Sequence, residues 1–424
     1  MSDETFTTTF TVLSEVSDGI DSVKDVRTEL IYSRVGQIPP KGIFYGDEEI
    51  SPKLGRILLS GKAHFFGVWS SRSASFDIAF RVKHINFDRY EGRYESDKLC
   101  EFICDELEVE TNYHLDKNGS DKVELILVMY AIPKRRELLL PKLPQELKKD
   151  LPEYKDWLQY ETTLGSMKIE RRTYSRAITV ESKQGLFSFD ESALSFVVPV
   201  GNRNLDEIIR QSERIVEDYV KLISFMLQCE TEYYKQEVRL LNSEKQELKN
   251  SLRLIQRIER TPNERPILFE WQTVDKLLKE LMPKFSSHSN KPDIEEAILL
   301  FLSGIHSKLA EACLILMEFA IETIMNKVKK SGHLKQRILQ VVSKWDVEIK
   351  DIYPTVFADN KKQFPFIYYR NKLAHGERNK IDYNDLPSEL YRQQLLLERL
   401  IFHWIGFDAR KVKYLKLWEG VKPY

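Results

Sequence analysis

Cysteine is scarce in this sequence, with four residues among 424: Cys100, Cys104, Cys229 and Cys313. Four scattered cysteines are too few for the disulfide framework of a small secreted protein, so we expect the protein to reside in a reducing cytoplasm. Cys100 and Cys104 together with His114 could supply three zinc ligands, but no second cysteine pair follows. Two cysteines one helical turn apart on a buried face are the commoner arrangement. We therefore expect no metal and no other cofactor.

Long hydrophobic runs and an excess of one charge are missing as well. The most apolar stretch, residues 297–325, is interrupted by Lys308, Glu311 and Glu318, which a membrane-spanning helix accommodates only at high cost. Residues 1–4 are acidic where a secretory signal is basic. Lysine and arginine number 64 against 65 aspartates and glutamates, so a surface that binds nucleic acid has to be local. These absences predict a cytoplasmic protein without a membrane partner.

Three common functional signatures are also lacking: a glycine-rich phosphate loop, a Walker pattern and a nucleophile elbow. The usual nucleotide-binding and serine-hydrolase chemistries therefore have no motif in this chain. A hydrophobic content of 42% with 11% aromatic residues is that of a globular protein. The length of 424 residues fits two or three domains.

The first 200 residues contain short β-prone runs separated by glycine, proline and aspartate. Residues 140–160 differ, because their charged, proline-punctuated sequence predicts a helical insertion. The spacing of the β-prone runs favours a β-rich domain, sandwich or barrel-like, over a parallel βαβ array. We expect strands at residues 10–16, 26–33, 42–45, 55–60, 75–82, 123–130, 177–181 and 194–200.

After residue 204 the hydrophobic period becomes helical, which predicts a helix near 204–227 that closes an N-terminal domain of residues 1–241. Residues 228–241 alternate loosely and fit either a strand or a helix. The next segment, 242–266, is highly charged and ends in a proline-bounded break, so we predict a linker there.

Residues 267–424 have the pattern of an all-α bundle. The predicted fold class is therefore α+β with two domains, a β-rich N-terminal domain followed by a C-terminal helical one. We expect helices at 274–281, 293–325, 335–345, 365–375 and 387–405.

The segment 370–376, Arg-Asn-Lys-Leu-Ala-His-Gly, carries the strongest chemical signal. Of the eight histidines, only His375 has an arginine five to seven positions before it. Asn371 follows Arg370 directly and adds a second polar group. Gly376 is placed to cap the end of the predicted helix.

These residue types suit RNA cleavage without a metal. A histidine with its unperturbed pKa of about 6.5 can take a proton from a 2′-hydroxyl or return one to the leaving oxygen. An arginine fork can bind the phosphate and stabilise its growing charge. Five residues turn an ideal helix by about 140°, so Arg370 and His375 do not share a helix face. A site then requires that His375 lie at the helix end, or that two chains bring their motifs together.

The segment resembles the Arg-Asn-x-x-x-His signature of HEPN domains, and most closely that of the ApeA-like HEPN antiphage proteins of bacteria. That resemblance also covers the order of the domains and two short N-terminal sequence segments, at residues 42–45 and 55–58. It implies a metal-independent endoribonuclease toxin of abortive infection and a homodimer with a composite RNA groove. It also implies that a phage-derived trigger activates the nuclease. One variant of the family ends its motif in His-x-Tyr, the tyrosine being modified by a partner antitoxin. Here Glu377 stands at that position, which argues against such a partner.

Residue by residue, the resemblance assigns catalytic roles to Arg370, Asn371 and His375. The nearby cations Lys372, Arg378 and Lys380 are added as candidate phosphate contacts, and no residue is assigned to a metal.

Two alternatives stay open at this point. In a non-catalytic HEPN module, the bundle dimerises, the β domain binds a ligand or a protein, and Arg370 and His375 pair with carboxylates. A nuclease that needs a metal is the other alternative. Glu318 and Glu322 lie one turn apart in the sequence, and one of them could orient Arg370, although a solvated helix edge is the commoner arrangement.

Overall fold

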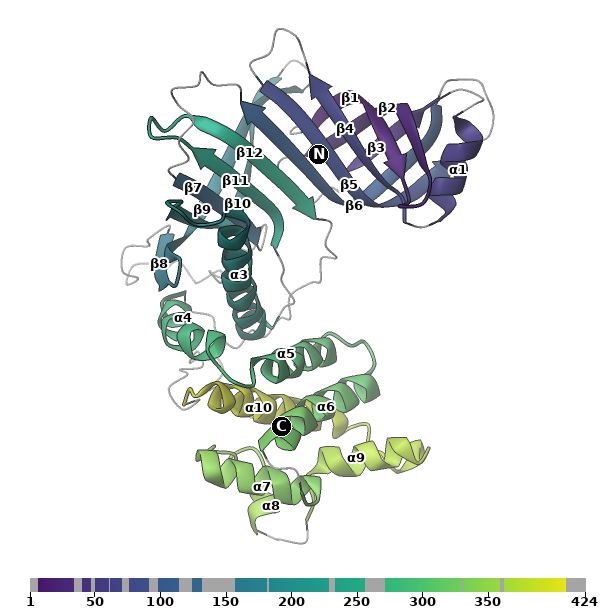
Figure 1. Ribbon diagram of the computed structural model, residues 1–424. Coiled ribbons are helices and arrows are strands. Elements are labelled where there is room, and N and C mark those ends of the chain that lie inside the picture. Colours follow the sequence, from purple (N-terminus) through teal and green to yellow (C-terminus); the bar gives the residue numbers. More distant parts are fainter. Residues whose placement is uncertain are drawn as a thin grey trace. The chain divides into compact units, whose positions relative to one another are not determined.

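A computed structural model (Figure 1) divides the chain into two compact units. One comprises residues 1–135, 149–217 and 232–259, and the other comprises residues 136–148, 218–231 and 260–424. The structure describes residues 7–33, 40–46, 50–60, 62–70, 76–90, 98–113, 124–131, 157–180, 183–228, 233–255, 271–328, 331–358 and 362–408.

The first unit is built on one antiparallel sheet of twelve strands in the order β3-β2-β1-β4-β5-β6-β12-β11-β7-β10-β9-β8. Helix α1 (Ser51–Leu59) and the first part of α3 (Leu205–Leu227) accompany it. The strands are β1 (Thr7–Ser17), β2 (Ser22–Ser33), β3 (Lys41–Tyr45), β4 (His64–Ser70), β5 (Phe76–Tyr90), β6 (Lys98–Tyr113), β7 (Glu124–Ala131), β8 (Trp157–Thr162), β9 (Gly165–Val180), β10 (Lys183–Pro199), β11 (Tyr233–Leu241) and β12 (Glu247–Ile255).

The first six strands close into a barrel, because β3 pairs with β6 as well as with β2. Strand β6 has two roles along its length. Residues 98–103 pair with β3 and close the barrel, whereas residues 106–112 pair with β12 and begin the extended part of the sheet. The β-rich N-terminal domain predicted from the sequence is therefore a barrel with further strands added at one edge.

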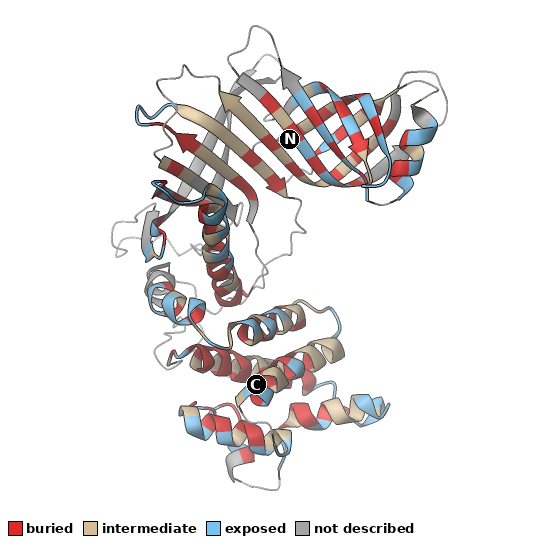
Figure 2. Ribbon diagram, viewed as in Figure 1, coloured by how far each residue is buried: buried red, intermediate tan, exposed pale blue. Residues whose placement is uncertain are grey.

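The barrel interior is packed with apolar side chains. Buried and exposed residues alternate along its strands, because one face of each strand points into the barrel and the other faces solvent (Figure 2). Phe102 stacks on Phe44 with ring centroids 4.4 Å apart, and Phe65 meets both rings edge-on. Gly42 lies against this cluster, where an added Cβ would stand 2.5 Å from a carbon of the Phe102 ring.

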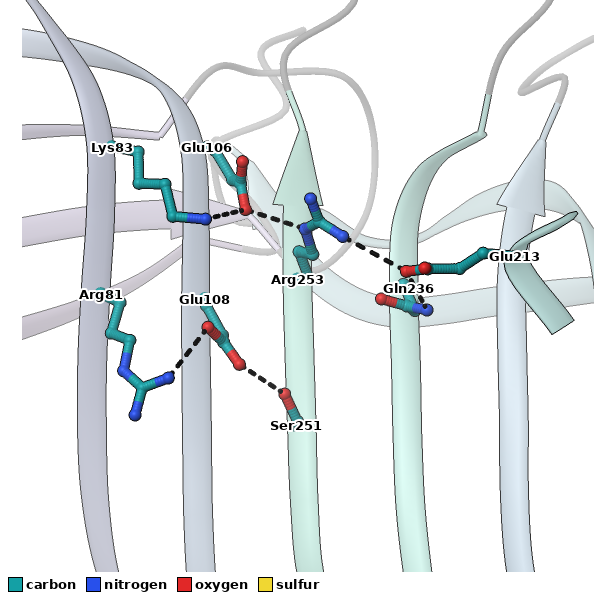
Figure 3. Close-up of polar contacts among 8 residues, drawn as sticks. All are labelled: Arg81, Lys83, Glu106, Glu108, Glu213, Gln236, Ser251 and Arg253. Carbon is teal, nitrogen blue, oxygen red and sulfur yellow. Dashed lines mark hydrogen bonds and ion pairs between the residues drawn. The ribbon is translucent and has the colours of Figure 1, made fainter. Parts of the chain in front are cut away.

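Charged side chains cover the outer face of the sheet where β6 meets β12 (Figure 3). Glu106 of β6 pairs with Lys83 of β5 at 3.1 Å and with Arg253 of β12 at 2.8 Å. Arg253 also pairs with Glu213 of α3 at 3.3 Å. Burial opposes ionisation of Glu106, but hydrogen bonds from Arg253 and Lys83 outweigh it and lower the pKa of this carboxyl. These cross-strand pairs match the observed register, and a slip of one residue would turn the buried side chains of the same strands outward.

The second unit is helical, as the sequence predicts. Its core is formed by buried side chains of α5, α6 and α10, with the ring of Phe225 from α3 packed on Phe301 and Phe402. The helices are α4 (Trp271–Ser286), α5 (Lys291–Ile305), α6 (Ala310–Val328), α7 (Leu334–Trp345), α8 (Pro354–Ala358), α9 (Pro365–Ala374) and α10 (Leu386–Ile405), with a 3-10 turn η4 (Arg378–Lys380).

Two expectations about the first unit are wrong. Residues 55–60, expected as a strand, form the end of α1 and its C-cap Ser60, and Leu54, Ile57 and Leu58 are buried at helical spacing. Cys100 and Cys104, expected on a helix, lie on β6 and point into the barrel core. An even spacing places residues on one face of a strand as well as near one face of a helix, so the spacing did not discriminate.

Three expectations about the chain's organisation also differ from the structure. Within the predicted linker 242–266, residues 247–255 form strand β12, with Leu252 and Leu254 buried between outward polar residues. The helix predicted near 204–227 is α3, but residues 218–227 group with the helical unit. The single helix expected at 293–325 is two helices, α5 and α6, because the chain turns at residues 306–309 and packs Gly304 closely against Met317. In the predicted insertion 140–160, residues 140–156 lie outside the described part.

Replacement of Phe102 by alanine is expected to destabilise the barrel strongly, because it removes a ring that packs against both Phe44 and Phe65. We expect the free energy of unfolding to fall by about 3 kcal/mol or more. The matched control is Phe66→Ala, since Phe66 lies on the outer face of β4 and is 43% exposed. Urea denaturation followed by circular dichroism measures both, and equal losses would contradict the barrel assignment.

Candidate active site

Helix α9 carries the candidate motif and ends where the sequence predicts. Gly376 adopts a left-handed conformation with φ of 71°, which favours glycine. Its N–H bonds to the carbonyl of Leu373 at 3.0 Å, and the N–H of Glu377 bonds to the carbonyl of Lys372 at 2.8 Å. These two bonds form a Schellman cap, and they place His375 at the C-cap position.

The start of α9 is fixed by a buried carboxylate from another helix. Glu389 of α10 is 0% exposed and accepts a hydrogen bond from the backbone N–H of Phe366 at 3.0 Å. It also accepts one from the hydroxyl of Tyr353 at 3.0 Å and one from Arg392 at 3.3 Å. Burial raises the pKa of Glu389 to about 7 despite these donors. Glu389 therefore acts as an N-cap supplied from outside the helix.

Arg370 faces α6 and meets two carboxylates there. Its Nε lies 3.4 Å from Glu318, and one of its terminal nitrogens lies 3.4 Å from Glu322. A second terminal nitrogen donates to the side-chain oxygen of Asn371 at 3.2 Å. Both glutamates singled out in the sequence thus orient Arg370, which turns its fork toward Asn371.

Glu318 is an unusual partner because its carboxyl group is almost fully enclosed. The residue is 1% exposed, and neither carboxyl oxygen accepts a hydrogen bond within the described residues. Burial raises its pKa to about 7, the positive charge of Arg370 lowers it in part, and Glu322 raises it further. Glu318 therefore carries only part of a negative charge near neutral pH, and Glu322 is the second carboxylate that faces Arg370.

His375 is exposed at the end of α9. In the part of the chain that the structure describes, its side chain has no hydrogen bond or ion pair. Its backbone N–H bonds to the carbonyl of Asn371 at 3.1 Å. The structure thus joins the side chains of Arg370 and Asn371 directly and leaves the imidazole of His375 open at the same helix end.

The three candidate phosphate contacts differ from one another. Lys372 and Lys380 both pair with Glu377, at 2.5 and 3.0 Å. Hydrogen bonds from these two lysines lower the pKa of Glu377 to about 2. Arg378 is exposed and has no ion pair with any residue that the structure describes. Of the three candidate phosphate contacts, only Arg378 is therefore not already paired with a carboxylate among the described residues.

Sequence reasoning missed the roles of Glu377 and Glu389. An acidic residue within a cluster of lysines and arginines is a signal that could have identified Glu377. Glu389 gives no such signal, because its partners at Tyr353 and Phe366 come from distant segments. Within the described ranges, no three His, Cys, Asp or Glu side chains gather as metal ligands would.

Comparison with known proteins adds no relative: no protein-family model and no curated protein sequence matches this chain. In the described parts of the chain, no helix is both long and apolar enough to cross a membrane.

Replacement of Glu389 by leucine is expected to be far more damaging than replacement by glutamine. Leucine leaves the Phe366 N–H, the Tyr353 hydroxyl and Arg392 without their shared acceptor, at a cost of about 3 kcal/mol or more in free energy of unfolding. Glutamine keeps an acceptor oxygen in a similar volume. Urea denaturation of both variants measures the difference. Equal free energies of unfolding would contradict the role of Glu389 in capping α9.

The raised pKa of Glu318 predicts a specific pH dependence of stability. In the unfolded chain the carboxyl has an ordinary pKa near 4.5, whereas in the folded chain it has a pKa of about 7. The folded state therefore binds the proton more tightly, and the contribution of Glu318 to stability declines as pH rises from about 4.5 to about 7.

Thermal melting of wild type and Glu318→Gln between pH 5 and pH 8 measures this effect. We expect the melting temperature of wild type to fall relative to the variant as the pH rises. Glu389 and Glu398, whose pKa values are also raised, are present in both proteins and cancel in the difference. A difference that is independent of pH would contradict the assignment.

Proposed function

We propose that this chain is a metal-independent endoribonuclease of the HEPN class, similar to the ApeA-like antiphage proteins, and that it acts in the cytoplasm as an abortive-infection toxin. The observation that carries the proposal is the arrangement at the end of α9. Arg370, oriented by two carboxylates and hydrogen-bonded to Asn371, lies on the helix that ends at the exposed His375, whose imidazole has no hydrogen bond to any residue that the structure describes. An anion-binding group and a proton-transfer group are the two parts that cleavage through a 2′-hydroxyl needs.

In the proposed reaction, the 2′-oxygen of a ribose attacks the adjacent phosphorus and the bond to the 5′-oxygen breaks. The products are a 2′,3′-cyclic phosphate and a 5′-hydroxyl. The imidazole of His375 takes the proton from the 2′-hydroxyl, and a second protonated group delivers one to the leaving 5′-oxygen. Arg370 binds the non-bridging oxygens and stabilises the charge that grows on them.

A homodimer supplies the second proton-transfer group in this scheme. Each chain has one histidine in the motif, so two chains related by a two-fold axis would offer two imidazoles to one RNA strand. The β-rich unit would then hold the nuclease inactive or detect a phage-derived trigger.

A second function is favoured by one observation. Arg370 is paired with Glu318 and Glu322, as expected for a non-catalytic HEPN module that dimerises while its β-rich unit binds a ligand. His375 lacks the carboxylate partner that this alternative requires, within the described residues. We therefore place the nuclease first.

Incubation of the purified full chain with total RNA in EDTA tests the nuclease. Wild type is expected to cut RNA and leave 2′,3′-cyclic phosphate ends, whereas Arg370→Ala and His375→Ala are expected to cut at least about 100-fold more slowly. His333→Ala is the matched control, because His333 is an exposed histidine at the start of α7. Its activity should equal that of wild type.

Two outcomes would count against the proposal. RNA left equally intact by wild type and by both variants, with phage lysate present as a source of the trigger, would favour the non-catalytic module. Cutting that disappears in EDTA would instead favour a metal-dependent nuclease.

A further inference from the structure

The segment after α9 concentrates positive charge around a single carboxylate. Lys372, Arg378 and Lys380 lie within nine residues, and Glu377 is the acidic residue among them. Glu377 binds Lys372 through one carboxylate oxygen, at 2.5 Å, and Lys380 through the other, at 3.0 Å. Two of the three cations are thus occupied by an internal anion.

The backbone holds Glu377 in this position. Its N–H bonds to the carbonyl of Lys372 in the Schellman cap, and its carbonyl accepts the N–H of Lys380 at 3.0 Å in η4. Both lysines are therefore brought to Glu377 by backbone bonds that do not involve its side chain. A change confined to the carboxylate should leave the lysines where they are.

An RNA phosphate at this surface has to compete with that carboxylate. Ion pairs between partly exposed groups contribute little to stability, so the contact of Glu377 is readily exchanged for another anion. The ammonium of Lys372 also lies 5.4 Å from the ring centre of Tyr368, which is itself exposed and available to stack on a base. The surface combines the two groups that bind single-stranded nucleic acid, cations and an aromatic face.

We propose that Glu377 sets the affinity of this surface for RNA, by occupying Lys372 and Lys380 until a phosphate displaces it. The identity of the polyanion as RNA rests on the proposed function; the competition at the two lysines does not. In this arrangement Arg378 makes the first contact with the RNA backbone, and the two lysines join once a phosphate displaces Glu377.

Binding of a fluorescent single-stranded RNA to the full chain tests the proposal. All proteins carry His375→Ala, so that cleavage does not disturb the measurement. Glu377→Gln is expected to bind about tenfold more tightly at low salt than the His375→Ala parent. The plot of log affinity against log salt should become steeper by about 1.4, because each added phosphate contact contributes about 0.7 for a single strand.

Glu348→Gln is the matched control. Glu348 is an exposed carboxylate after α7 with no side-chain ion pair in the described structure, so its loss changes the net charge equally without freeing a lysine. Its affinity and salt slope should stay close to those of the parent. Adding Lys372→Gln and Lys380→Gln to Glu377→Gln should abolish the gain.

Three results would overturn the proposal. One is an equal effect of Glu377→Gln and Glu348→Gln, and another is the absence of RNA binding by every protein. The third is a lower melting temperature of Glu377→Gln with an unchanged salt slope, which would make Glu377 a purely structural residue. A failure of the nuclease test leaves the binding comparison intact, so the two proposals can fail separately.

Discussion

The enclosed carboxylate of Glu389 is the interaction on which the candidate site depends. It brings together three segments that are distant in sequence: the turn at Tyr353, the first turn of α9 and helix α10. A ten-residue helix such as α9 is too short to be stable alone, so its position comes from its packing and its caps. Glu389 fixes one end and the Gly376 cap fixes the other. Arg370 lies between these two ends and meets Glu318 and Glu322 of α6.

The helical unit contains two further carboxyls with a pKa raised to about 7, those of Glu318 and Glu398. Glu398 is enclosed by amides, with Gln228 donating at 2.6 Å and Gln394 at 3.0 Å. Neutral donors can serve a protonated or an ionised acid, whereas Glu318 has a charged partner and no hydrogen bond within the described residues. Protonation of Glu318 thus alters the site, because it weakens the ion pair with Arg370.

The sequence predicted the features that depend on local chemistry. The helical half and the glycine cap after His375 follow from spacing and residue type. For Glu318 and Glu322 the sequence indicated only that one of them could orient Arg370, with a solvated helix edge the commoner arrangement, whereas both meet it. It failed where tertiary pairing decides. Residues 247–255 are a strand because β6 leaves half of its edge free for β12, and a charged segment gives no hint of that partner. Barrel closure by β3 and β6, and the reach of Glu389 to α9, likewise depend on contacts between distant segments.

The near balance of charge over the whole chain is repeated at the site itself. Arg370 faces two glutamates, and two of the three nearby cations face Glu377. A basic groove attracts nucleic acid at long range, whereas a balanced one binds only when a phosphate can replace the internal anion. That distinction suits the nuclease proposed above, which would have to stay inactive among cellular RNA. In the proposed arrangement the affinity of the site for RNA is low while its carboxylates hold the cations. A substitution that removes the charge of such a carboxylate would raise this affinity without moving the backbone.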